Sequence, residues 1–174
     1  PKLIVPANYS KGCPGHGYVV IEKNNKKICT INLIGRTNIN DVMSNNPFEI
    51  ADQIVTEVKA DIYMVDFHAE ATAEKLAMGH FLDGRITGLF GTHTHIPTAD
   101  NRILPKGTGY ITDLGMTGPS NSILGMDIKT ALIRFVKSLP EKYKVAEGPV
   151  ELNGAIFDID DDTNRVKRVY RVHL

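Results

Sequence analysis

Short apolar runs and longer amphipathic stripes alternate along this chain, as they do when strands and helices follow one another. Four runs rich in β-branched or aromatic residues predict strands over residues 2–5, 17–22, 27–34 and 62–67. The second and third runs are separated by polar residues 23–26, which include two asparagines that tolerate the left-handed turn conformation. We therefore expect these two strands to form a β-hairpin.

Helical periodicity occurs in three stretches. Asn46 and Pro47 are typical of an N-cap and a first helical position, and the amphipathic stripe behind them extends to Val58. A second helix is predicted over residues 72–81, where a following Asp-Gly pair stops it. A third helix is predicted over residues 127–138, with an aspartate as its N-cap.

Two more strands are predicted in the middle of the chain, over residues 86–90 and 109–113. The second predicted helix lies between the strands predicted over residues 62–67 and 86–90. This strand–helix–strand order implies that the two strands are parallel. Three stretches are predicted to be irregular because they are polar or rich in glycine and proline: residues 9–17, 98–105 and 115–125.

The last part of the chain changes character. Alternating apolar and polar residues predict strands over 142–145, 150–160 and 165–172, and the last two are joined by an Asp-rich turn at 161–164. These strands are expected to be antiparallel. We therefore predict one domain over residues 1–174, of the α/β class, with a mixed sheet, flanking helices and antiparallel additions.

Composition excludes several classes of protein. The chain has 174 residues, 42% hydrophobic and 23% charged, as is ordinary for globular proteins. Lys+Arg and Asp+Glu are equal at 20 each, so no overall field attracts nucleic acid or an anionic membrane. No apolar run approaches the roughly 20 residues of a membrane span. We expect a cytoplasmic protein with no membrane partner, in which Cys13 and Cys29 are reduced thiols.

Three histidines stand where an α/β protein places its chemistry. His68 follows the strand predicted over residues 62–67, and His93 and His95 follow Gly91 at the end of the next strand. The carboxyl ends of parallel strands meet at one edge of a sheet, where ligands bind. Neutral imidazole is a common ligand of Zn, Fe and Ni, so a metal site is one interpretation, and solvated loop histidines are the other.

Charged residues near these histidines favour the metal site. Asp66, Glu70 and Asp100 could act as ligands or orient the imidazole rings from behind. Arg102 could bind a phosphate, because a guanidinium group matches phosphate geometry, although a surface salt bridge is the more ordinary use.

The chain closely resembles the bacterial YmdB-like branch of the calcineurin-like metallophosphoesterases. Four motifs carry the resemblance: residues 66–72 (DFHAEAT), 91–95 (GTHTH), 98–105 (TADNRILP) and 113–119 (DLGMTGP). The likeness extends over nearly the whole chain, from a Pro-Ala-Asn sequence near the start to a strand near the end.

This resemblance implies a layered metallophosphoesterase-like sandwich and a dinuclear centre of two divalent metal ions, either Fe, Mn or Zn. A hydroxide activated by the two metals would hydrolyse phosphodiesters, and 2′,3′-cyclic nucleotides are the substrate class associated with this branch. Carried over by motif, His68 and His93 would bind one metal and His95 the other. We expect a small-molecule phosphodiester as substrate, and RNA stays open as a second substrate or partner.

Several motifs of the superfamily are absent from this sequence. The first Asp-x-His motif, the bridging carboxylate or Asn, and the Asn-His pair with the general-acid His have no counterpart here. Three histidines alone lack a bridging anion and enough ligands for two metals. We therefore expect residues 1–174 to be the C-terminal portion of a metallophosphoesterase domain, inactive by itself, whose site the N-terminal half of the same enzyme completes.

Two alternatives remain at this point. One is a non-catalytic binding or assembly module with a metallophosphoesterase-like fold. The other is a metal amidohydrolase, which needs a (β/α)₈ barrel of about 250 residues and is therefore less favoured. We also expect a homo-oligomer, because exposed strand edges invite pairing. The remaining histidines, His16, His80 and His173, are expected to be structural or solvated.

Overall fold

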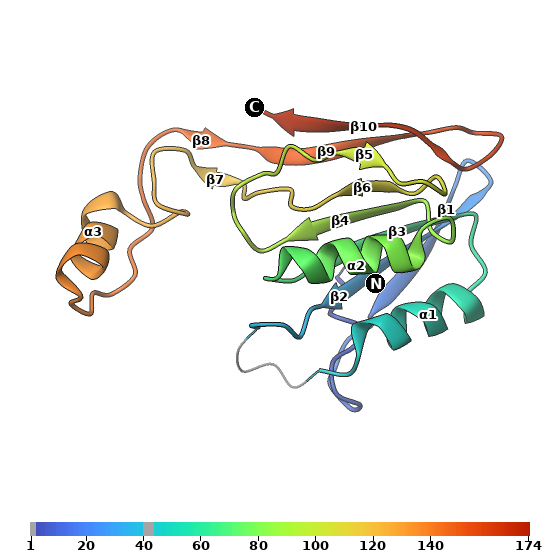
Figure 1. Cartoon of the computed structure of the whole chain (residues 1–174), viewed down its shortest axis with the longest axis horizontal. Helices are drawn as coiled ribbons and strands as arrows, with labels where there is room; N and C mark the ends of the chain where they lie inside the picture. The colour runs from blue at the N-terminus through green and yellow to red at the C-terminus, as the bar shows by residue number, and fades with distance from the viewer. Residues whose placement is uncertain (1–2, 40–43) are drawn as a thin grey trace.

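The computed structural model describes residues 3–39 and 44–174, and Figure 1 shows a twisted sheet with helices on one side and a long hairpin on the other. Within the described part, six strands form one sheet in this spatial order: β1 (Tyr18–Lys23), β2 (Lys26–Ile34), β3 (Ile62–His68), β4 (Gly88–Thr92), β6 (Gly109–Ile111) and β5 (Arg102–Ile103). The centre of the sheet, from β2 to β6, is parallel, and β1 and β5 pair antiparallel at its two edges.

The helices form where the sequence predicts them. Helix α1 (Pro47–Glu57) begins at Asn46, whose side chain accepts a hydrogen bond from the backbone N–H of Phe48 at 3.1 Å. Helix α2 (Thr72–Leu82) connects β3 to β4 and ends before Asp83. Helix α3 (Ile128–Lys137) begins at Asp127, which accepts a hydrogen bond from the backbone N–H of Thr130. Both caps satisfy N–H groups that the first helical turn leaves without partners.

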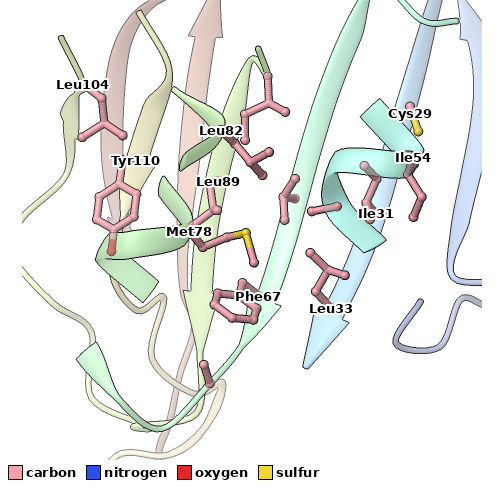
Figure 2. Packing of buried hydrophobic residues seen from close by; sticks show 14 residues of the cluster. Cys29, Ile31, Leu33, Ile54, Phe67, Met78, Leu82, Leu89, Leu104 and Tyr110 are labelled. Carbon is pink, nitrogen blue, oxygen red and sulfur yellow. The ribbon is translucent and has the colours of Figure 1, made fainter. Parts of the chain in front are cut away.

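The main core lies between the sheet and helices α1 and α2 (Figure 2). Its fully buried side chains include strand residues that alternate along β2, β3 and β4, and helix residues that recur at helical spacing: Ile31, Leu33, Val65, Phe67, Leu89, Ala51, Met78 and Leu82. Alternation sends every second strand residue to this face. The intervening residues, including Asp66, His68 and Thr92, belong to the opposite face.

A C-terminal hairpin covers part of that opposite face. Strands β9 (Asn153–Ile159) and β10 (Val166–His173) are antiparallel, and β10 contacts β5 and β6. The Phe157 ring lies over Gly88 and Gly109, where an added Cβ would come within 2.9 and 2.8 Å of it. The absence of side chains at these glycines therefore lets the hairpin approach the sheet.

Helix α3 lies away from the main sheet, beyond the short antiparallel strands β7 (Gly118–Pro119) and β8 (Val150–Glu151) (Figure 1). Ala131 is its buried residue, whereas Phe135 and Val136 are 78% and 74% exposed. Most of its apolar stripe is thus not covered by described residues.

The structure corrects the prediction at five places. Residues 3–5 are not a strand, and Lys2 lies outside the described residues. The strand predicted over 142–145 is reduced to an isolated bridge at Val145. The stretch predicted over 150–160 is divided into β8 and β9, and β5 and β7 form inside segments that were predicted to be irregular. Short pairings such as these depend on partners far away in sequence, which local patterns do not reveal.

Other expectations concern the molecule as a whole. The mixed α/β class and the antiparallel tail are confirmed. The described strands form open sheets and no closed barrel, which is against the amidohydrolase alternative. Cys13 and Cys29 are both free, and burial raises the pKa of the Cys29 thiol to about 11. In the described ranges, no helix combines the length and apolar character that a membrane span needs.

Candidate metal centre

Two imidazole rings meet at the carboxyl ends of neighbouring parallel strands. His68 is the last residue of β3, and its register partner on β4 is Thr92, the residue before His93. The His68 Nε2 and His93 Nδ1 atoms are 3.2 Å apart, and the two rings are at 72° to each other. The Thr92 hydroxyl lies 3.0 Å from His68 Nδ1. One ring nitrogen of His68 is therefore anchored by β4, and the other points at His93.

The 3.2 Å separation is that of a hydrogen bond between the two rings, and it is also compatible with two ligands of one metal ion. Nitrogen ligands lie about 2.0–2.1 Å from zinc, so two of them in a tetrahedral site are separated by about 3.3 Å. The 3.2 Å between His68 Nε2 and His93 Nδ1 is close to that separation. The Thr92 hydroxyl contacts the His68 ring as an outer group that orients a ligand ring would.

The electrostatic surroundings of His68 disfavour its charged form. Burial lowers the pKa of this imidazole, and the positive charges of His93 and Lys75 lower it further, against a smaller opposing effect of Asp113. A neutral imidazole has a free nitrogen lone pair, which is the form that binds a metal ion.

The loop after β4 is held in an unusual backbone conformation. His93 has a φ of 132° and His95 a φ of 64°, both in the range that favours glycine. Between them, the backbone N–H of Thr94 donates to Asp113 Oδ2 at 3.0 Å, and the Thr94 hydroxyl donates to the carbonyl of Ile96 at 2.8 Å. Such strain of non-glycine residues clusters at functional sites, where surrounding contacts enforce it.

A buried ion pair supports this loop from below. Lys75 Nζ, on α2, and Asp113 Oδ2, after β6, are 2.7 Å apart, and both side chains are fully buried. Burial alone would raise the pKa of the Asp113 carboxyl, but hydrogen bonds from Lys75, Thr94 and Gly115 outweigh it and lower this pKa. Asp113 thus stays ionised. Its two carboxylate oxygens accept hydrogen bonds from the backbone N–H groups of Thr94 and Gly115.

The third predicted ligand, His95, lies at the edge of this arrangement. Its side chain is exposed, and its Nδ1 is 3.1 Å from the carbonyl oxygen of Leu124. His95 follows His93 by two positions on the same loop, and its effect is the smallest of those that shift the pKa of His68. Its Nε2 atom stays available to a ligand.

Of the four accompanying charged residues, Asp66 is the one that lies beside the pair. It shares a sheet face with His68 two residues further on, and its Oδ2 accepts from Asn32 Nδ2 at 2.8 Å. Burial raises the pKa of this carboxyl, and the hydrogen bonds from Asn32 and Thr92 only partly compensate. Asp66 Oδ1 is buried and has no hydrogen-bond partner among the described residues.

The other three predicted residues are not brought into the site. Glu70 is exposed. Asp100 accepts hydrogen bonds from the backbone N–H of Thr112 at 3.1 Å and from the hydroxyls of Thr112 and Thr98, so it fastens the loop after the His-x-His pair. Arg102 is exposed on β5 and lies 5.6 Å from the centre of the Tyr110 ring.

The described residues supply only part of a metal site. No group of three or more His, Cys, Asp or Glu side chains gathers in metal-binding geometry within residues 3–39 and 44–174. The described residues therefore bring two imidazoles together, those of His68 and His93, with the exposed ring of His95 on the same loop.

Sequence reasoning missed Thr92, Lys75 and Asp113. Asp113 carried a usable signal, because it is a carboxylate at the end of a predicted strand, as Asp66 is. Lys75 carried none, since a lysine in a helix is ordinarily exposed. The role of Thr92 depends on the register of β3 and β4, which the sequence does not specify.

Comparison with known proteins agrees with this architecture. The family model described as YmdB-like protein matches residues 1–172. The chain belongs to the YmdB-like family. A 2′,3′-cyclic-nucleotide 2′-phosphodiesterase of Bacillus subtilis (strain 168) is 48% identical to this YmdB-like chain over 174 residues, which is 99% of the chain and 65% of the relative.

Two solved structures share the YmdB-like fold of this chain. A hypothetical protein from Thermus thermophilus has a TM-score of 0.90 and 37% identity, covering 98% of this chain and 67% of the other. A novel phosphatase of Mycoplasma pneumoniae has a TM-score of 0.92 and 36% identity, covering 98% and 63%. The YmdB-like chain thus spans about two thirds of the length of these relatives.

Proposed function

We propose that this chain is the C-terminal portion of a metal-dependent phosphodiesterase domain that hydrolyses small phosphodiesters, with 2′,3′-cyclic nucleotides as the substrate class. The observation that carries the proposal is the 3.2 Å approach of His68 Nε2 and His93 Nδ1 at the carboxyl edge of a parallel sheet. The relative from Bacillus subtilis, at 48% identity, supports the choice of substrate.

The proposed roles follow from the position of each side chain. His68 and His93 would hold one of two divalent ions, and His95, with its free Nε2, would contribute to the other. Iron, manganese and zinc all suit a site of imidazoles and carboxylates. Divalent ions in such sites neutralise the phosphate charge and lower the pKa of water for an in-line displacement.

The remaining residues of the site would act by positioning. Thr92 fixes the rotation of the His68 ring, and Asp113 holds the backbone of Thr94 between the two loop histidines. Asp66 would orient the site from below, and its buried Oδ1 is available to a donor or ion supplied from outside the described residues. Because these contacts hold the side chains in place, less free energy would be spent on positioning them during the reaction.

The missing ligands and the general acid are proposed to come from the N-terminal part of the same enzyme. This chain spans 65% of the length of its Bacillus subtilis relative, which leaves about a third of that length for the rest of the site. The structure gathers fewer than three ligand side chains at any one place in its described part. We therefore expect the 174 residues alone to be inactive.

The experiment that tests this function uses the full-length protein. His93→Ala is expected to abolish hydrolysis of 2′,3′-cyclic AMP and to lower the metal content measured by elemental analysis, while the circular dichroism spectrum stays unchanged. His80→Ala is the matched control, because His80 is an exposed histidine on α2. Near-normal turnover of the His93→Ala variant would overturn the proposed function.

A further inference from the structure

A cavity of about 430 Å³ adjoins the loop that carries His95. It is lined by Pro97, Asn153, Arg171, Val172 and His173. Four of these residues belong to the open end of the β9–β10 hairpin, and the fifth follows His95 by two positions. In Figure 1, β4 and β10 end on the same side of the molecule. The cavity therefore lies next to the loop that follows β4 and carries His95.

The hydrogen bonds of Asn153 determine which nitrogen of His173 carries a proton. Asn153 is 8% exposed, and its Nδ2 donates to the carbonyl of Met116 at 2.8 Å and to Glu151 Oε1 at 3.0 Å. These two bonds fix the orientation of the amide, and its Oδ1, which carries no hydrogen, faces His173 and can only accept. His173 Nδ1, 3.0 Å away, must then be the donor. His173 Nε2 is left for a ligand.

The wall of the cavity is connected to the metal-binding loop through short contacts. The backbone N–H of Met116, whose carbonyl holds Asn153, donates to the carbonyl of His95 at 2.9 Å. Pro97 packs against Gly115, where an added Cβ would be 2.7 Å from Pro97 Cδ. A molecule bound in the cavity would therefore sit at a fixed position relative to His95.

The lining combines features that suit a nucleoside. Pro97 offers apolar surface for the face of a base, and Arg171 and His173, which share one face of β10, offer polar groups for a base edge or a ribose hydroxyl. Arg171 is exposed and forms no ion pair with a described residue. A volume of about 430 Å³ is within the range of small-molecule sites.

We propose that this cavity binds the nucleoside part of the substrate while the phosphate lies at His68 and His93, and that Arg171 and His173 thereby favour nucleotides over simple phosphodiesters. This inference rests on the proposed function. It changes the interpretation of His173, which was expected to be structural or solvated. Its hydrogen-bonded ring becomes a specificity-determining group.

The test compares two substrates on the full-length enzyme. Arg171→Ala and His173→Ala are expected to raise KM for 2′,3′-cyclic AMP about tenfold each, the effect of losing about 1.4 kcal/mol of binding. Hydrolysis of bis(p-nitrophenyl) phosphate, which has no nucleoside, is expected to stay unchanged. Arg168→Ala is the matched control, because Arg168 is on the same strand but stacks on Tyr170.

Contrary outcomes separate the cavity from the proposed function. Equal losses on both substrates, or no loss on either, would overturn the nucleoside cavity even if the enzyme is an active phosphodiesterase. If the unmodified full-length protein hydrolyses neither substrate, the proposed function fails, and adenosine binding observed by saturation-transfer NMR then decides about the cavity separately. Adenosine signals that persist in His173→Ala and Arg171→Ala would overturn it.

Discussion

His93 and His95 both occupy left-handed backbone conformations, which cost a non-glycine residue about 1–3 kcal/mol each. The contacts that enforce this conformation are visible: Asp113 accepts from Thr94 between them, and Leu124 contacts the His95 ring. The backbone at His93 and His95 therefore does not continue the extended conformation of β4. At the scale of single residues, the site is thus held by groups that do not themselves act as ligands.

A prediction for Thr92 follows from its contact with the His68 ring. Thr92→Val keeps the shape of the side chain but removes the hydroxyl 3.0 Å from His68 Nδ1. We expect metal affinity of the full-length protein to fall about 10–100-fold, as is typical when a group that orients a ligand is lost. Competition with a metal-binding dye measures this, and Thr56→Val, at an exposed position of α1, is the control. Unchanged affinity would show that the hydroxyl does not orient the ring.

Gly91 leads to a prediction about stability. An added Cβ would collide with the carbonyl oxygen of Thr112 and lie 2.9 Å from Lys75 Cδ. We expect Gly91→Ala to lower the free energy of unfolding by about 1–3 kcal/mol, the usual effect of overpacking. Gly154→Ala is the control, since nothing lies within 4 Å of its added Cβ. Urea denaturation measures both, and equal stabilities would contradict the proposed collision.

At the scale of elements, the candidate site depends on contacts that helix α2, strand β6 and the β9–β10 hairpin make around β4. The ion pair between Lys75 and Asp113 connects α2 to the end of β6, directly below the loop that follows β4. The Phe157 ring connects the C-terminal hairpin to Gly88 on β4. The α2 contact thus supports the loop end of β4, and the hairpin contact supports its beginning.

The buried ion pair can be tested by removing its cation. Lys75→Met leaves the Asp113 carboxylate without a counter-charge in a fully buried position. We expect the free energy of unfolding to fall by about 3–5 kcal/mol, as is typical when one member of a buried pair is removed. The control Asp52→Asn, which breaks the exposed pair with Arg85, is expected to cost about 1 kcal/mol or less. Similar losses in the two variants would contradict this account.

At the scale of the whole molecule, the two faces of the main sheet have different uses. One face is packed against α1 and α2 and contains the core (Figure 2). The other carries His68, Thr92 and Asp66 and is covered in part by the β9–β10 hairpin. This division leaves polar side chains on the second face, where a further part of the full-length protein is proposed to complete the site. A cytoplasmic location and a homo-oligomer stay predictions.

The free energy of unfolding at acid pH depends on carboxyl groups throughout the chain. Burial acts to raise the pKa of Asp100, but hydrogen bonds from Thr112 and Thr98 outweigh it, and the pKa of Asp113 is likewise lowered. Carboxyls whose folded pKa is lowered stabilise the fold fully above their unfolded pKa of about 3.9, and this contribution is lost as pH falls through the folded pKa. Asp66, whose pKa burial raises, acts in the opposite direction.

We therefore expect the urea midpoint to fall steeply below about pH 4. Asp100→Asn is expected to reduce this fall, because the amide does not titrate. The measurement is circular dichroism in urea at pH 7, 5 and 3, with Asp52→Asn as the control at an exposed carboxyl. A variant with the same pH dependence as the unmodified protein would show that Asp100 does not contribute.

The sequence by itself located the three helices, the main strands of the sheet and the histidines that follow β3 and β4. Short apolar runs located β3 and β4, and the Asn46 and Asp127 caps located two helices, because these signals come from residues near one another in the chain. The carboxyl-edge position of His68 and His93 followed from the same signals. The possible supporting role of Asp100 stays a prediction; its carboxylate accepts hydrogen bonds from Thr98 and Thr112 and thereby fastens the loop after the His-x-His pair.

Only the tertiary structure decided how the side chains meet. Lys75 and Asp113 are 38 positions apart, and no local pattern indicates that their charges are buried together. The approach of His68 to His93 depends on the register of β3 and β4. The contact of His173 with Asn153 depends on the pairing of β9 and β10. Register and packing arise from the competition of many distant contacts for the same core, so they are properties of the folded chain and not of any segment.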